Sequence, residues 1–133
     1  MIHGFRHLQI TAVSLDEIKH TLERCRALGV REVTLVTHSF EFYFLDSAAS
    51  HRGHLNRLNV ERLRGLSRFL HERSEDFEVD TVGALARRLK EGRAAVTAPL
   101  SAVQEFPRST PSHHARRVVE QAYKRVAQRL TFA

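Results

Sequence analysis

Residues 7–38 read HLQITAVSLDEIKHTLERCRALGVREVTLVTH, and this stretch decides the fold class of the chain. Residues 7–11 alternate in polarity and predict a short strand. Ser14-x-x-Glu17 is the signature of a capping box at the start of a helix, which Gly29 ends. Residues 32–38 are dense in β-branched side chains and predict a largely buried strand. A strand, a helix and a strand joined by short turns make a βαβ unit with parallel strands.

The same alternation continues beyond this unit. Asn59 is expected to cap a second helix, with apolar residues on one side and its arginines in solvent, namely Arg62, Arg64, Arg68 and Arg73. Residues 77–81 predict a third strand, and Thr81 then caps a short helix that Gly92 ends. This order favours an α/β fold with a parallel sheet. Because three strands are few, either residues 40–46 add a strand or something outside this chain completes the sheet.

The C-terminal part breaks the pattern. Residues 93–109 contain two prolines and predict a linker, and Thr110-Pro111 predicts the start of a last helix. We expect its apolar stripe to dock on the body and its basic residues to stay in solvent; the stripe is Ala115, Val118, Ala122, Val126 and Leu130. The sequence therefore divides into βα units over 1–92 and a basic linker plus helix over 93–133.

Composition limits the function classes. The 133 residues are 42% hydrophobic and 27% charged, which is typical of a soluble globular chain. The net charge of +6 lies mostly in residues 93–133, which hold seven Lys/Arg against two Asp/Glu, so no basic face of the body indicates nucleic-acid binding. One cysteine, Cys25, excludes an intrachain disulfide and a cysteine-built metal site. Neither a signal peptide nor a membrane-spanning segment is indicated, so we expect a cytoplasmic protein.

His38 is the first candidate for a functional residue. It ends the predicted strand 32–38, and parallel α/β folds place their working residues at the carboxyl ends of strands. An imidazole can donate or accept a proton near neutral pH. The alternative from position alone is that His38 satisfies a backbone carbonyl at the end of the strand.

Several segments, in this order and spacing, resemble the C-terminal region of polysaccharide deacetylases: His7-Leu-Gln-Ile-Thr-Ala-Val-Ser14, then Glu17, then Leu35-Val-Thr-His-Ser-Phe-Glu41, then Phe77-Glu-Val-Asp-Thr81. The resemblance implies a partial, deformed (β/α) barrel with flanking helices and a helical C-terminal extension. It also implies that Val36-Thr37-His38 matches the family's hydrophobic-x-His motif, whose histidine acts as general acid.

The resemblance further implies hydrolysis of an N- or O-acetyl group on a polysaccharide. In that family a divalent metal such as zinc activates a water molecule, a carboxylate takes the water's proton, and the histidine protonates the leaving group. The family's paired aspartates and metal-binding histidines belong to earlier strands, so the resemblance assigns no metal ligand to this chain. We therefore expect a deacetylase-like part that is inactive alone and that needs a metal-bearing N-terminal half or self-association.

Other candidates have simpler structural interpretations. His51 and His54 are three apart but lie in an expected loop, and the adjacent His113 and His114 are expected to face solvent at a helix start. Glu78 and Asp80 are expected to form the polar side of a strand, and Cys25 an inert part of the core.

Two alternative functions stay open. One is a non-catalytic interaction module of the same fold. The other is an anion binder built on the basic C-terminal helix, which could meet an acidic partner, RNA or an anionic membrane surface. Its few aromatic residues, Tyr123 and Phe132, do not indicate base stacking.

Overall fold

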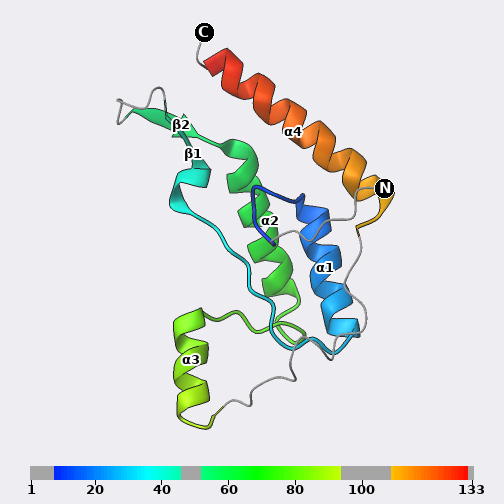
Figure 1. The fold of residues 1–133 in the computed structure, drawn as a ribbon, viewed down its shortest axis with the longest axis vertical. Coiled ribbons are helices and arrows are strands. Elements are labelled where there is room, and N and C mark those ends of the chain that lie inside the picture. Colours follow the sequence, from blue (N-terminus) through cyan, green and yellow to red (C-terminus); the bar gives the residue numbers. More distant parts are fainter. Residues whose placement is uncertain (1–7, 46–51, 94–108, 132–133) are drawn as a thin grey trace.

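The computed structural model describes residues 8–45, 52–93 and 109–131 of the chain. These ranges form a mixed α/β structure (Figure 1), whose elements are α1 (Leu15–Ala27), a 3-10 helix η1 (Ser39–Phe42), β1 (Tyr43–Leu45), β2 (Gly53–Leu55), α2 (Arg57–Glu72), α3 (Val82–Lys90) and α4 (Pro111–Thr131). Helix α4 crosses one end of the α1–α2 pair, and α3 lies at the opposite end. No helix in the described ranges is both long and apolar enough to cross a membrane.

Helix α1 begins and ends as the sequence predicts. The Ser14 hydroxyl accepts a hydrogen bond from the Glu17 N–H at 3.3 Å, and the Glu17 carboxylate accepts one from the Ser14 N–H at 3.4 Å. These two bonds satisfy two of the backbone donors that a helix start leaves free. Gly29 follows the helix with a φ of 72°, a conformation that costs a residue without Cβ little. The capping box and the glycine stop are thus confirmed.

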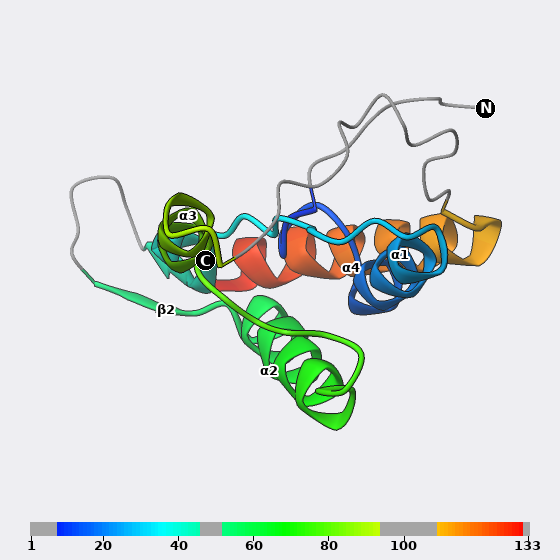
Figure 2. The same cartoon turned by 90° about the horizontal axis from the view of Figure 1, so that it is seen from below.

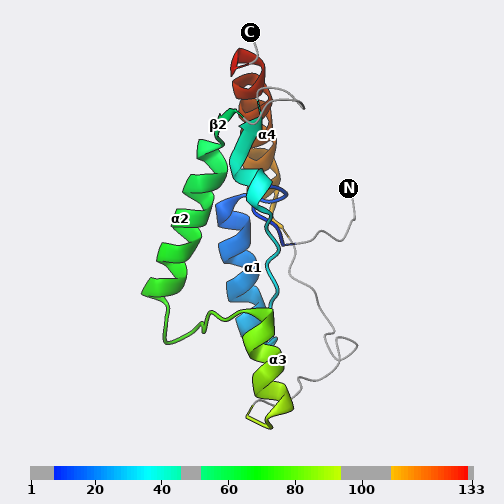
Figure 3. The same ribbon diagram turned by 90° about the vertical axis from the view of Figure 1, so that its left-hand side faces the viewer.

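The core lies between α1, α2 and the segment that precedes α1. Its buried members are Ile10, Val13, Ile18, Leu66 and Phe69. Helix α2 and the extended segment 30–38 lie on opposite sides of α1 (Figures 2 and 3). Leu35 of that segment packs on the core with part of its surface. Apolar burial therefore joins α1 to both of its neighbours.

The predicted three-stranded parallel sheet is not seen in the described ranges. Residues 8–11 and 32–38 meet in a single parallel bridge, Gln9 with Val36, in which the Val36 N–H donates to the Leu8 carbonyl at 3.1 Å. Residues 77–81 form no strand. A central parallel strand needs a partner on each side, and no second partner lies beside 32–38 in the part that the structure describes. Val33 and Val36 consequently keep 37% and 42% of their surface exposed instead of being buried.

The strand expected within residues 40–46 does exist, but in a different pairing. Residues 39–42 first form η1, and Tyr43–Leu45 then pairs antiparallel with Gly53–Leu55, with Tyr43 opposite Leu55. The strand β2, which pairs with β1, comes from residues that were expected to form a loop before the second helix. Local pairing needs only a short connection, so it forms without any distant strand.

Helix α2 begins three residues earlier than predicted, because Asn56 is its N-cap. The Asn56 side chain accepts from the Asn59 N–H at 3.4 Å, whereas Asn59 itself lies inside the helix. The prediction that Arg62 faces solvent is wrong, since only 3% of its surface is exposed. Its guanidinium is instead bonded to the Ile10 carbonyl at 2.6 Å and to Glu120 of α4 at 2.5 Å. These acceptors offset the cost of removing the charge from water.

Helices α3 and α4 begin where the sequence predicts. The Thr81 hydroxyl accepts from the Ala84 N–H at 3.1 Å, and α4 begins at Pro111 after Thr110. The expected docking of the apolar stripe of α4 is wrong: Val118 and Val119 are each 67% exposed, and Val126 is 56% exposed. The polar side of α4 faces the body, where the Glu17 carboxylate accepts from Arg117 and the Thr11 carbonyl accepts from the Gln121 side-chain amide. The predicted linker falls mostly on residues 94–108, outside the described ranges.

Candidate functional site at the carboxyl ends of two parallel segments

The Gln9–Val36 bridge sets the position of the candidate site. Because the two segments are parallel, their carboxyl ends lie at the same edge, and this brings Thr11 close to Thr37 and His38. Such edges are where open α/β structures commonly bind ligands. The parallel order predicted for these two segments is therefore sufficient to assemble a polar cluster.

Glu41 of η1 is the centre of this cluster. Its carboxylate accepts hydrogen bonds from the Thr11 hydroxyl at 3.0 Å and the Thr37 hydroxyl at 3.0 Å. It also accepts from the His38 backbone N–H at 3.1 Å and from the Gln9 side-chain amide. With 8% of its surface exposed, Glu41 is a buried carboxylate held by donors from both parallel segments. The carboxylate thus ties the ends of these segments together.

The same contacts decide the ionisation of Glu41. Burial alone raises the pKa of its carboxyl, but the hydrogen bonds from His38, Thr37, Thr11 and Gln9 outweigh burial and lower the pKa from its usual value. Donors that point at a carboxylate favour its charged form. Glu41 is therefore a permanent anion near neutral pH and a poor proton donor.

The backbone of Glu41 also fixes the start of α2. Its carbonyl oxygen accepts from the side-chain amides of Asn56 at 3.1 Å and Asn59 at 2.7 Å. Both asparagines are buried, at 2% and 0% exposure. Their hydrogen bonds connect the carboxyl edge of the parallel segments to the N-terminus of α2, and so restrict the movement of η1.

The structure places His38 at the edge of this cluster with its side chain exposed. Its ring stacks on Phe40, with 5.0 Å between ring centroids and 7° between planes. Its backbone N–H is the one that Glu41 binds. The position of the imidazole is thus set by the bound backbone of His38 and by stacking on the Phe40 ring. Because the side chain is exposed, it can contact a molecule that approaches from solvent.

Helix α4 lies against the other side of the cluster. The Gln121 side-chain amide donates to the Thr11 carbonyl at 3.1 Å. Burial lowers the pKa of the half-buried Lys124 and the nearby Arg62 lowers it further, while the Glu41 carboxylate opposes both. The negative charge of Glu41 thus favours the protonated form of Lys124 in α4.

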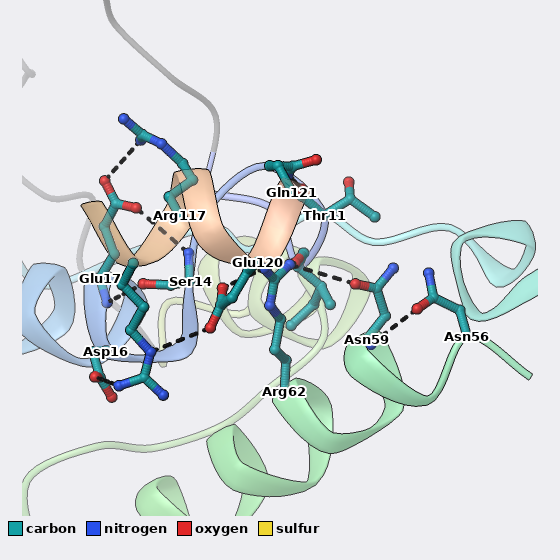
Figure 4. Close-up of polar contacts among 12 residues, drawn as sticks. Thr11, Ser14, Asp16, Glu17, Asn56, Asn59, Arg62, Arg117, Glu120 and Gln121 are labelled. Atoms are coloured by element: carbon teal, nitrogen blue, oxygen red, sulfur yellow. Dashed lines mark hydrogen bonds and ion pairs between the residues drawn. The ribbon is translucent and has the colours of Figure 1, made fainter. Parts of the chain in front are cut away.

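Ion pairs also attach α4 to the body. Arg117 Nη1 donates to the buried Glu17 carboxylate at 3.0 Å, and Arg62 of α2 binds Glu120 (Figure 4). Glu17 also accepts from the Ser109 hydroxyl and remains part of the capping box of α1. The Glu17 carboxylate therefore both completes the capping box of α1 and binds the C-terminal helix α4.

The other candidates from the sequence do not join this cluster. His54 lies in β2 against the ring of Phe44, and its proposed companion His51 lies outside the described ranges. Arg88 binds both Glu78 and Asp80, the latter at 2.9 Å, which makes this carboxylate pair an anchor for α3.

The two histidines at the start of α4 have structural partners. His113 Nδ1 accepts from the Thr110 N–H at 3.2 Å and its ring lies 4.9 Å from that of His20, while His114 contacts Arg117. His113 is half-buried rather than fully solvated. Cys25 is buried, as expected for a core residue, and burial raises the pKa of its thiol.

The described ranges contain no group of three His, Cys, Asp or Glu side chains that could share a metal ion. The sequence contains one pair of histidines four apart, His3 and His7. No Asp-Asp pair accompanies it, and both histidines lie outside the described ranges.

Glu41 was not among the predicted site residues. The signal that could have found it is a single carboxylate between Phe40 and Phe42, in a stretch that is otherwise apolar up to Leu45. A charge in such a position needs dedicated donors when it is buried.

Comparisons of the chain with models of known families, with curated proteins and with solved structures gave no match. The functional assignment therefore rests on the residues and on their geometry.

Proposed function

We propose that this chain is the late-strand part of a polysaccharide-deacetylase-like protein, in which His38 protonates the leaving group when an acetyl group is removed from a sugar. The observation that carries the proposal is the position of His38. It lies exposed at the carboxyl end of one of two parallel segments, and its main chain is held by the buried Glu41. This position agrees with the role that the Val36-Thr37-His38 motif has in the family that the chain resembles.

The proposed proton transfer is a single step. The protonated imidazole of His38 approaches the nitrogen or oxygen of the sugar as its bond to the acetyl carbon breaks. The imidazole N–H bond breaks, a new N–H or O–H bond forms on the sugar, and His38 becomes neutral. Glu41 does not exchange a proton in this step, because its pKa lies below the usual value and its oxygens accept bonds from four donors.

Glu41 and Phe40 would keep the imidazole in place during this step. The Glu41 carboxylate fixes the backbone at His38 and Thr37, and the Phe40 ring restricts rotation of the imidazole by stacking on it. A general acid that is already oriented loses less entropy in the transition state.

The metal-bound water of the family would come from a partner. The described residues do not fit the family's divalent metal, since they gather no set of ligands for it. Val33 and Val36 on the extended segment 30–38 are exposed, and a partner that adds a strand beside this segment would cover part of their surface. We therefore propose that a metal-bearing half, or a second copy, completes the sheet there.

An isolation experiment tests the proposal. The tagged full chain would be recovered from its native cells under non-denaturing conditions, and acetate release would be measured with acetylated chito-oligosaccharides and acetylated xylan. We expect acetate release by the native complex, with a loss of about a hundredfold or more in His38→Ala, the usual contribution of a general acid. His71→Ala, at an exposed histidine of α2, is the matched control and should keep full activity.

The outcomes separate the candidates. Equal activity of His38→Ala and His71→Ala would exclude the role of His38. A complex that forms through residues 30–38 but releases no acetate would favour the second candidate, a non-catalytic interaction module, which the exposed Val33 and Val36 also support. An anion binder built on α4 is less well supported, since Arg116 and Arg117 are both engaged in ion pairs with the body.

A further inference from the structure

Helix α4 presents its apolar residues to solvent. Val118, Val119, Tyr123 and Val126 are between 56% and 67% exposed, and the neighbouring Ala115 and Ala122 are exposed as well. At 100° per residue these six side chains lie on one side of the helix. We call them the outer face of α4. An exposed apolar face of this length is a common mark of an interaction site.

The outer face cannot simply turn toward the body. The opposite side of α4 is held by the buried pair Arg117–Glu17, by the bond of Glu120 to Arg62 and by the bond of Gln121 to the Thr11 carbonyl (Figure 4). Rolling the helix to bury the valines would remove all of these partners and leave Glu17 and Arg62 as buried charges. Because that is costly, the outer face remains directed at solvent.

The spacing of the outer face indicates what shape it fits. Ala115, Val119, Ala122 and Val126 follow one another at intervals of four, three and four residues. This is the spacing of the a and d positions in a coiled-coil seam. Small and β-branched side chains in such a seam let a second helix approach closely. The complementary shape is therefore another α-helix with an apolar stripe.

Charge indicates which helix fits. Arg125 flanks the seam at the position that precedes Val126, and it is exposed. Arg116 flanks the other side, after Ala115, but its charge is already paired with Asp16 and Glu120. The single acidic residue among 111–131, Glu120, lies on the docked side, bound to Arg62 and Arg116. Flanking charges of a seam select partners of opposite sign. A second copy of α4 would add further arginines beside the seam, whereas a helix with acidic flanks would neutralise Arg125.

We propose that the outer face of α4 binds an amphipathic helix of a protein partner whose apolar stripe is flanked by Asp or Glu. This interaction is independent of the proposed role of His38, which lies on a different surface at the end of the segment 30–38. It needs neither a metal nor a sugar substrate.

Two synthetic peptides test the proposal on the full chain. Both have three heptads with Leu at a and d, and carry either Glu or Lys at every e and g position, so that each repels itself. Binding would be followed by fluorescence anisotropy. We expect the Glu peptide to bind at least about tenfold more tightly than the Lys peptide. Equal affinities would overturn the acidic-partner proposal.

Substitutions locate the binding site. Val119→Glu should weaken the Glu peptide by about tenfold or more, whereas Val82→Glu, at a valine of α3 with similar exposure of 69%, should leave its affinity unchanged. Arg125→Glu should lower affinity for the Glu peptide and raise it for the Lys peptide. Far-UV circular dichroism would verify that all three variants keep the helix content of the parent chain.

Three further results would overturn the proposal. One is a Val119→Glu variant that binds the Glu peptide like the parent. Another is a dimer in sedimentation equilibrium that Val119→Glu dissociates, which would make a second copy the occupant. The third is binding to phosphatidylglycerol vesicles that Val119→Glu abolishes while the Glu peptide does not bind, which would make an anionic lipid surface the occupant.

Discussion

Arg117 donates from Nη1 to Glu17 at 3.0 Å, and the two residues are 100 positions apart in the sequence. Both are buried, with 9% and 3% of their surface exposed. Glu17 is at the same time the acceptor that completes the capping box of α1. The start of the first helix and the position of the last one thus depend on the same carboxylate.

Removing Arg117 should be strongly destabilising. Arg117→Ala leaves Glu17 buried without its cation, which we expect to lower the free energy of unfolding by about 3 kcal/mol. Urea denaturation followed by circular dichroism measures this change. The matched control is Arg116→Ala, whose partners Asp16 and Glu120 lie nearer the surface. Exposed pairs contribute about 1 kcal/mol or less, so similar losses in the two variants would contradict the buried pair.

Glu41 should give the protein a specific loss of stability in acid. Its pKa in the folded state is lower than the value of 4.5 expected for an unperturbed side chain. The stabilisation is therefore complete above the unfolded pKa and is lost as the pH falls through the folded one. Glu41→Gln removes this contribution, so its unfolding free energy should change less than that of the parent as the pH falls from about 5 to 3.

The control for this prediction is Glu61→Gln, at an exposed carboxylate of α2 that pairs with Arg64. Its pH dependence should follow that of the parent chain. Urea midpoints measured at half-unit pH steps would compare the three proteins. If stability depended on pH in the same way in the parent and in Glu41→Gln, the hydrogen bonds to Glu41 would not lower its pKa in the folded state.

Local signals predicted where α1, α3 and α4 begin, whereas partners distant in sequence decided most of the rest. Ser14 with Glu17, Thr81, and Thr110 with Pro111 act through bonds to residues within a few positions, so their motifs suffice. Residues 32–38 did not form the predicted strand, because a strand needs hydrogen-bonded neighbours and the described ranges give it a single bridge. The pairing of β1 with β2 was not predicted, because the periodicity of a short segment does not identify the segment with which it pairs.

The candidate site shows the same division. His38 was found because its place at the end of an extended segment is readable from the pattern. Glu41 and Arg62 were not predicted as buried residues, because their hydrogen-bond partners lie far away in the sequence. Glu41 accepts from Gln9 and Thr11, and Arg62 donates to Ile10 and Glu120. Periodicity revealed that α4 is amphipathic, but which side docks depends on buried carboxylates elsewhere in the chain.

The packing of α2 on α1 should depend strongly on Leu66. This side chain is 4% exposed within the core cluster, so Leu66→Ala should lower the free energy of unfolding by about 2–5 kcal/mol. Leu63→Ala, in the same helix at 38% exposure, should cost about 1 kcal/mol or less. Chemical denaturation of both variants measures the difference. A loss at Leu63 equal to that at Leu66 would show that α2 packs through a different face.

Two glycine-to-alanine substitutions should act in opposite directions. Gly29 has a φ of 72° just after α1, so Gly29→Ala forces a side chain into the left-handed region and should destabilise the protein by about 1 kcal/mol. Gly83 lies in the first turn of α3 with no atom within 4 Å of an added Cβ, so Gly83→Ala meets no clash and should stabilise by about 0.5 kcal/mol through higher helix propensity. Each is the control of the other, because both remove the same backbone freedom from the unfolded chain. Thermal unfolding should give a lower midpoint for Gly29→Ala and an unchanged or higher one for Gly83→Ala, and a fall of equal size in both would refute the positive φ as the cause.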